Sequence, residues 1–117
     1  MILCVVDDLM FSVKISSAAK AVNAPIVFER LPHAVLGRVR NERPSLVIFD
    51  LNSNRLNPID TIAAIKADPD LAGTRTLGYA SHVQADVIGA ARAAGCDEVL
   101  ARSAFSDRLG AILSSAS

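Results

Sequence analysis

The sequence predicts a doubly wound α/β domain built on a five-stranded parallel sheet. Short apolar runs alternate with longer amphipathic segments along all 117 residues. The runs at residues 2–6 and 46–49 are wholly apolar, which is typical of strands buried on both faces of a parallel sheet. The segments between the runs are long enough for crossover helices. This favours right-handed parallel units with helices on both faces of the sheet.

The first half of the chain is predicted to contain two strand–helix units. After the first strand, apolar residues at helical spacing predict a helix over residues 9–23. Pro25 ends this helix, because proline disfavours helical geometry in the residue before it. A short strand over residues 26–28 follows. The second helix begins near Pro32, which suits a first turn, and ends near residue 41.

The middle of the chain contains the central strand, over residues 46–50, which ends in the carboxylate of Asp50. A polar loop separates this strand from a helix over residues 58–67. Pro58 opens that helix, and an Asp-Pro-Asp segment breaks it. The fourth strand is predicted over residues 76–79, where a glycine weakens it.

Two further helices and a strand complete the predicted fold. An apolar stripe predicts a helix over residues 83–94, which Gly95 ends in the usual C-terminal position. A strand over residues 98–100 follows, and Ser103 is a suitable N-cap for the last helix. We expect the Ser-rich end, residues 113–117, to be frayed. Five such units match the flavodoxin-like strand order 2-1-3-4-5, whose ligand crevice lies between the first and third strands.

The composition indicates one domain, residues 1–117, and argues against several classes of protein. Hydrophobic residues make up 51% of the chain, which excludes a disordered protein. No apolar run approaches the roughly 20 residues of a membrane span, and no signal peptide is recognisable, so we expect a cytoplasmic protein without membrane contact. The net charge is zero without a Lys/Arg block, which argues against nucleic-acid binding. Cys4 and Cys96 are interpreted as buried hydrophobic residues rather than a disulfide.

Carboxylates follow both strands that flank the predicted crevice. Asp7 and Asp8 come directly after the first strand, and Asp50 ends the third. Carboxylates that converge repel each other and need a cation or protons to coexist, and few hard oxygen ligands suit Mg²⁺. Alternatively, Asp7 and Asp8 only cap the first helix, and Asp50 is a solvated strand end. The occurrence of both groups at the switch point favours the functional site.

These residues resemble the receiver domain of two-component response regulators. The resemblance covers almost the whole chain and rests on Val-Val-Asp-Asp at 5–8, Leu-Val-Ile-Phe-Asp at 46–50 and Ala-Ala-Gly-Cys-Asp at 93–97. It implies that Asp50 accepts a phosphoryl group from a histidine kinase, a phosphotransfer protein or a small acyl phosphate.

The resemblance also implies Mg²⁺ as the cofactor. The implied ligands beside Asp50 are Asp8 directly, Asp7 through water, and the backbone carbonyl of Asn52.

The chain departs from the family pattern at the positions that, in that family, contact the phosphoryl group or move on activation. The Thr or Ser expected at the end of the fourth strand aligns with Ala80, and Ser81 would replace it only if the strand slipped by one residue. The family Lys aligns with Arg102, which keeps the charge but is planar. The following Pro aligns with Ser103, so a trans peptide is expected there. The aromatic residue of the fifth strand aligns with Val99.

Three hypotheses about the function follow from the sequence. The first is a single-domain receiver phosphorylated on Asp50, which is not an enzyme and signals to an unknown protein target. The second is a phosphorylation-independent pseudo-receiver, a constitutive interaction module. The third, a small phosphatase with Asp50 as nucleophile, ranks last because position 52 is Asn and neither a suitably placed Lys nor a cap domain is present.

We expect the binding partners of this protein to be proteins only, not nucleic acids or membranes. The resemblance implies a monomer, or a weak homodimer through the face formed by the helix at 83–94, the strand at 98–100 and the last helix. Alternatively, the small residues of the helix at 83–94 only pack tightly on its own sheet. We interpret His82 and Arg55 as exposed loop side chains, and Tyr79 as core packing.

Overall fold

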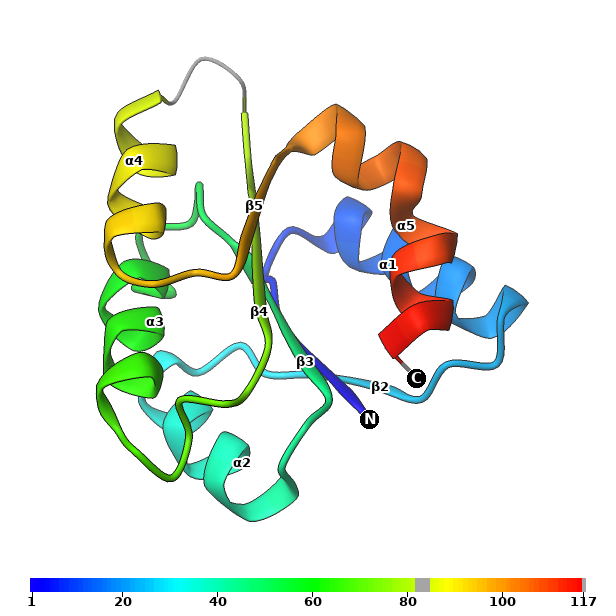
Figure 1. Ribbon diagram of the computed structural model, residues 1–117. Coiled ribbons are helices and arrows are strands. Elements are labelled where there is room, and N and C mark those ends of the chain that lie inside the picture. The colour runs from blue at the N-terminus through cyan, green and yellow to red at the C-terminus, as the bar shows by residue number, and fades with distance from the viewer. Residues whose placement is uncertain (82–84, 117) are drawn as a thin grey trace.

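The five predicted strands form one parallel sheet in this computed structural model, which describes residues 1–81 and 85–116. The strands are β1 (Ile2–Val5), β2 (Ile26–Phe28), β3 (Leu46–Asp50), β4 (Thr76–Ala80) and β5 (Glu98–Ala101). Their order is β2-β1-β3-β4-β5, so the predicted fold class and strand order are confirmed (Figure 1). None of the helices in this described part of the chain is long and apolar enough to cross a bilayer.

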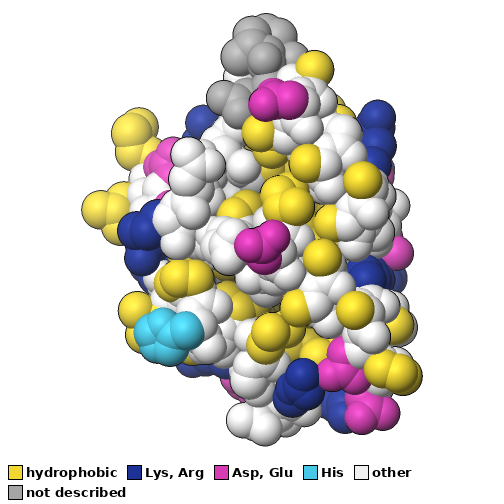
Figure 2. Space-filling model, turned by 90° about the vertical axis from the view of Figure 1, so that its left-hand side faces the viewer, with side chains coloured by type: hydrophobic (Ala, Val, Ile, Leu, Met, Phe, Trp, Pro, Cys, Tyr) yellow, Lys and Arg dark blue, Asp and Glu magenta, His cyan; other side chains and the backbone are white. Residues whose placement is uncertain are grey.

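Helices cover both faces of the sheet (Figure 1). In chain order they are α1 (Leu9–Ala21), α2 (Val35–Glu42), α3 (Pro58–Ala67), α4 (Ala85–Ala93) and α5 (Arg102–Ala116), and a 3₁₀ turn, η1 (Pro32–Ala34), leads into α2. One face carries α1 and α5, and the other carries α2, α3 and α4. Figure 2 views the second face, on which Lys and Arg side chains are dispersed rather than gathered into one patch.

The core has two layers, one on each face of the sheet. The first layer packs the rings of Phe11 and Phe105 against β1, β3 and β4. The second places residues such as Val39 and Ile62 against the opposite face. Cys4 lies in the first layer and Cys96 in the second, and both thiols are free and buried as predicted.

The ends of three helices differ from those predicted. Helix α1 ends two residues early, because Asn23 adopts a left-handed backbone with φ of 55°. The first turn after Pro32 is a 3₁₀ turn rather than α-helix. The two residues that would extend α4 to its predicted start lie outside the described part of the chain, as does His82. Gly95, with φ of 97°, follows α4 as expected for a glycine C-cap.

The predicted frayed end is wrong for residues 113–116, and Ser103 is not an N-cap. Helix α5 begins at Arg102, so Ser103 lies within its first turn, and the helix continues to Ala116. Packing overrides the Ser-rich composition there, because Leu113 and Ala116 are buried. The hydroxyl of Ser45 also donates to the carbonyl oxygen of Ala116.

Strand β4 extends one residue further than predicted, to Ala80, and all of its residues are buried. Its glycine serves a packing role rather than only weakening the strand. A Cβ at Gly78 would lie 2.7 Å from Cδ1 of Leu51, the first residue after β3. Glycine therefore allows the loop that follows Asp50 to lie directly on β4.

Asp97, from the third segment that carries the resemblance, has a structural role. Its Oδ2 accepts hydrogen bonds from Nζ of Lys66 at 2.8 Å and from the amide of Thr76 at 2.8 Å. Burial raises the pKa of Asp97, but these hydrogen bonds outweigh it, and the pKa is lowered overall. The network joins α3, β4 and β5 near the start of β4, at the opposite end of that strand from Ala80.

Candidate functional site

Asp50 is the centre of the candidate site. It ends the central strand β3 and is only 6% exposed. Its Oδ1 accepts a hydrogen bond from the amide of Asn52 at 2.9 Å. Burial raises the pKa of Asp50, and the nearby negative charges of Asp7 and Asp8 add to this rise, whereas the Asn52 amide and Arg102 oppose it. The carboxylate is thus held in place on one oxygen while its environment disfavours its charge.

Asp8 joins the start of α1 to the start of α5. Its Oδ1 accepts from the amide of Phe11 at 3.1 Å, which makes it the N-cap of α1. Its Oδ2 accepts from Nη2 of Arg102 at 2.8 Å. The Phe11 hydrogen bond and then the Arg102 hydrogen bond lower the pKa of Asp8. The capping role considered from the sequence is therefore confirmed for Asp8, whose other oxygen pairs with Arg102.

Asp7 is paired with an arginine from the loop after β3. Nε of Arg55 donates to Oδ2 of Asp7 at 2.9 Å, and Nη2 of Arg55 donates to the carbonyl of Arg30 at 2.9 Å. The Arg55 side chain is 55% exposed, as predicted; a carboxylate contact was the alternative for Arg55, but the sequence did not identify Asp7 as the partner. One guanidinium group thereby connects the loops after β1, β2 and β3.

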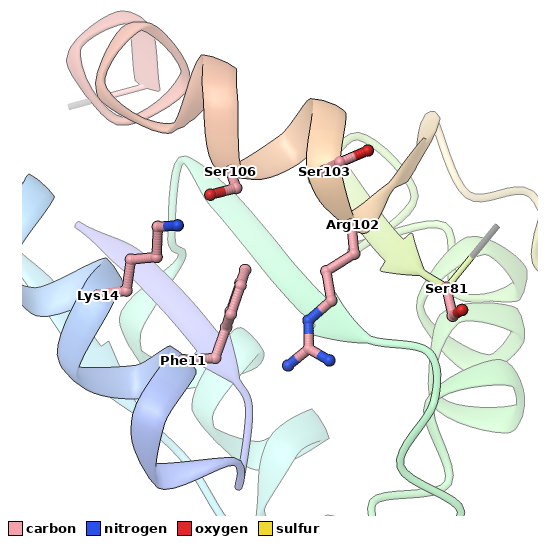
Figure 3. A pocket seen from close by; sticks show the side chains of 6 residues that line it. All are labelled: Phe11, Lys14, Ser81, Arg102, Ser103 and Ser106. Carbon is pink, nitrogen blue, oxygen red and sulfur yellow. The ribbon is translucent and has the colours of Figure 1, made fainter.

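Arg102 occupies the position expected from the resemblance. Its Cζ lies 4.6 Å from the centroid of the Phe11 ring, so the guanidinium stacks on an aromatic face while it binds Asp8. Beside it, a pocket of about 390 Å³ lies between α1 and α5, lined also by Lys14, Ser81 and Ser106. Figure 3 shows Lys14 and Ser106 directing their polar ends into the space between the two helices.

Ser81 lies one residue beyond β4 and does not take the place of the missing hydroxyl by a slip of the strand. Ala80 remains the last residue of β4, in register with Ala101, and is fully buried. The amide of Ser81 donates to Oδ1 of Asn52 at 3.4 Å. In Figure 3 the Ser81 hydroxyl points away from Arg102.

Tyr79 packs in the core, as predicted, and lies beside Asp50 at the end of the sheet. It pairs in register with Asp50 and is fully buried. Its ring stacks on that of Phe105, with centroids 4.7 Å apart and an interplanar angle of 7°. Within the described residues its hydroxyl has no hydrogen-bond partner. Burial raises the pKa of Tyr79, and the charge of Asp50 raises it further, so the phenol is neutral.

The donor chemistry at this edge suits a hard divalent cation, but the carboxylates are not grouped around one common position. Among the described residues, no three Asp, Glu, His or Cys side chains are grouped so that they would bind a metal ion. Asp7 and Asp8 are each turned toward a guanidinium group. The ligand set implied by the resemblance, Asp7, Asp8, Asp50 and the carbonyl of Asn52, therefore stays a prediction.

No family model and no curated protein matches the chain. Solved structures do. The response regulator signal receiver domain from Bermanella marisrubri is similar with a TM-score of 0.82 and 18% identity, covering 98% of this chain and 95% of that one. The chain has the receiver-domain fold.

Two further similar structures are those of a metal-bound and of a phosphorylated response regulator. The Mn²⁺-bound form of response regulator Rcp1 is similar with a TM-score of 0.79 and 19% identity, covering 95% of this chain and 89% of that one. The phosphorylated cyanobacterial phytochrome response regulator RcpA is similar with a TM-score of 0.80 and 22% identity, covering 97% and 88%. At these identities the likeness concerns the fold alone.

Proposed function

We propose that this protein is a receiver in phosphorelay signalling and that Asp50 accepts the phosphoryl group. The observation that carries the proposal is the position of Asp50, at the end of the central strand of a receiver fold and beside a carboxylate pair and an arginine. Only Oδ1 of Asp50 makes a hydrogen bond within the described residues. Its Oδ2 is the atom that attacks phosphorus, and the donor's histidine nitrogen or acyl oxygen leaves with the bonding electron pair.

The neighbouring residues have distinct roles in this proposal. The amide of Asn52 holds the carboxylate in one orientation. Arg102 lies beside Asp8 and offers a guanidinium group to the phosphoryl oxygens. Mg²⁺, held by Asp7, Asp8, Asp50 and the Asn52 carbonyl, would offset the negative charge of the transferred group.

The proposed partners are a histidine kinase or phosphotransfer protein and one unidentified target protein, in the cytoplasm. The protein itself turns over no substrate and signals by contact. Any pairing of two copies is proposed to use the face formed by α4, β5 and α5.

One observation favours a second candidate, a phosphorylation-independent pseudo-receiver. Arg55 and Arg102 already neutralise Asp7 and Asp8, so the fold holds its acidic edge without an added cation. Ala80 also offers no hydroxyl at the end of β4. Such a module would bind its partner constitutively.

The deciding experiment is the intact mass of the protein after incubation with acetyl phosphate, with and without Mg²⁺. The receiver proposal predicts a Mg²⁺-dependent phosphoryl adduct on wild type and none on Asp50→Asn. An Asp107→Asn variant, changed at an exposed α5 position, is the matched control and should carry the adduct. A folded wild-type protein that gains no adduct would reject the receiver proposal in favour of the constitutive module.

A further inference from the structure

We propose that Arg55 competes with a divalent cation for Asp7, and that cation binding releases the loop around Arg30. This inference deepens the proposed function, because it concerns the cation site of the same acidic edge. It assigns to Arg55 control over cation affinity and over the loop between β2 and η1.

The contacts of Arg55 are the first argument. Its Nε binds Oδ2 of Asp7 at 2.9 Å, and its Nη2 binds the carbonyl of Arg30 at 2.9 Å. A water molecule bound to a dication would donate to the same Asp7 oxygen and compete with the guanidinium for it. The bond to the Arg30 carbonyl is made by the same planar group, so both contacts are lost when the group leaves.

The charge balance of the edge is the second argument. Three carboxylates, Asp7, Asp8 and Asp50, face two guanidinium groups, which leaves one net negative charge. A dication added to this set reverses the sign to one net positive charge. Like charges so close together repel, and the departure of one arginine restores neutrality.

Arg55 is the arginine that leaves, because Arg102 is held more firmly. Arg102 stacks on the Phe11 ring with its Cζ 4.6 Å from the centroid, and its partner Asp8 is fixed as the N-cap of α1. The side chain of Arg102 is 41% exposed, against 55% for Arg55. No aromatic ring stacks on Arg55 within the described residues.

The third argument is that the loss of Arg55 would free the backbone at Arg30. The guanidinium of Arg30 lies over the Phe28 ring, with its Cζ 5.0 Å from the centroid, and donates to Oγ of Ser12 at 3.2 Å. The next amide, that of Leu31, is held by Oε2 of Glu29 at 3.0 Å. Between these two fixed points, Arg55 is the contact that ties the Arg30 carbonyl to the acidic edge.

The test measures Mn²⁺ binding without any phosphoryl donor, by the electron paramagnetic resonance signal of free Mn²⁺. Arg55→Gln should bind Mn²⁺ about 1.5-fold to fivefold more tightly than wild type, the range set by the loss of one exposed ion pair. Arg92→Gln removes the same charge from an exposed position in the last turn of α4 and should leave the affinity unchanged. Both variants should retain the wild-type circular dichroism spectrum.

A second readout follows the loop itself by nuclear magnetic resonance. Mg²⁺ should move the amide signal of Leu31 in wild type and in Arg92→Gln. In Arg55→Gln this signal should lie near its Mg²⁺-bound wild-type position before Mg²⁺ is added, and move little afterwards.

Two results would overturn the inference: equal Mn²⁺ affinity in wild type and Arg55→Gln, including no binding by either, or a Leu31 amide that ignores Mg²⁺ in wild type. These results are separable from a failure of the proposed function. Tighter binding by Arg55→Gln together with no phosphoryl adduct rejects phosphorylation and keeps the inference. An adduct on wild type with unchanged Mn²⁺ affinity in the variant does the reverse.

Discussion

Arg102 and Asp8 are joined by a contact of 2.8 Å between Nη2 and Oδ2, although 94 residues separate them in the chain. The contact links the first turn of α5 to the N-cap of α1. It therefore fixes two helices on the same face of the sheet as well as one of the acidic side chains. Because Asp8 is also bound by the Phe11 amide, the carboxylate has two partners with separable effects.

The first prediction separates those two effects. Arg102→Met should lower the free energy of unfolding by about 1 kcal/mol, since it removes an exposed ion pair and the stacking on Phe11. It should raise the pKa of Asp8 only part of the way, because the Phe11 amide is the larger cause of the lowered value. Urea unfolding and carboxyl titration by nuclear magnetic resonance measure the two quantities. An unchanged pKa of Asp8 would contradict the prediction, and Arg102→Lys should retain most of the pKa effect.

The second prediction concerns the pH dependence of stability through Asp50. An acid with a raised pKa in the folded state binds its proton more tightly there than in the unfolded chain, so its ionisation lowers the free energy of unfolding. Asp50→Asn should therefore be more stable than wild type at pH 7, by about 1.4 kcal/mol for each unit of the rise.

The difference between the two proteins should shrink as the pH falls through the raised pKa of Asp50 and vanish below about pH 3.9, the unfolded value. Urea unfolding at several pH values measures it. Asp107→Asn should show no such pH-dependent gap. If Asp50→Asn is instead less stable than wild type at pH 7, and this deficit disappears as the pH falls, the pKa of Asp50 is lowered in the folded state.

The third prediction concerns the hydroxyl of Tyr79. This buried hydroxyl has no partner in the described part of the chain, so its desolvation is not offset by a hydrogen bond. Tyr79→Phe keeps the ring stacked on Phe105 and should raise the free energy of unfolding by about 1 kcal/mol. A loss of stability in urea unfolding would instead indicate that the hydroxyl is bonded in solution.

The fourth prediction compares two glycines. Gly78→Ala should lower the free energy of unfolding by about 2 kcal/mol, because the added Cβ would lie 2.7 Å from the buried side chain of Leu51. Gly89→Ala, within α4, meets no atom within 4 Å and should raise it by up to about 1 kcal/mol through helix propensity. Thermal unfolding of both variants gives the signs. A neutral Gly78→Ala would mean that the loop after Asp50 shifts without cost.

The sequence predicted the sheet and the position of Asp50 because both follow from local patterns. An apolar run that is buried on both faces is visible without knowledge of its neighbours, and a carboxylate at its end is placed by the topology alone. The same reasoning placed Asp7 and Asp8 at this edge. Their position depends only on the end of β1.

The partners of these residues could not be predicted in the same way. Arg55 lies in a loop without periodicity, 48 residues from Asp7, and only the folded structure brings the two together. That the Tyr79 hydroxyl finds no partner among the described residues depends on three-dimensional packing, which no sequence spacing reveals. The prediction for the end of α5 is wrong because the Ser-rich composition suggests fraying, whereas packing keeps the helix intact. Leu113 is buried in the first core layer despite the serines that follow it.

The placement of α5 beside α1 has a consequence for how the chain folds while the ribosome is still synthesising it. Once β3 has been synthesised, β1 has both of its neighbours in the sheet. The layer that contains Phe11 and Ile15 stays uncovered, however, until Phe105 and Leu109 of the last helix arrive. A nascent chain therefore exposes the part of this apolar face that α1 does not cover until α5 has been synthesised. That face is where a chaperone would be expected to bind, and folding is completed only when α5 docks.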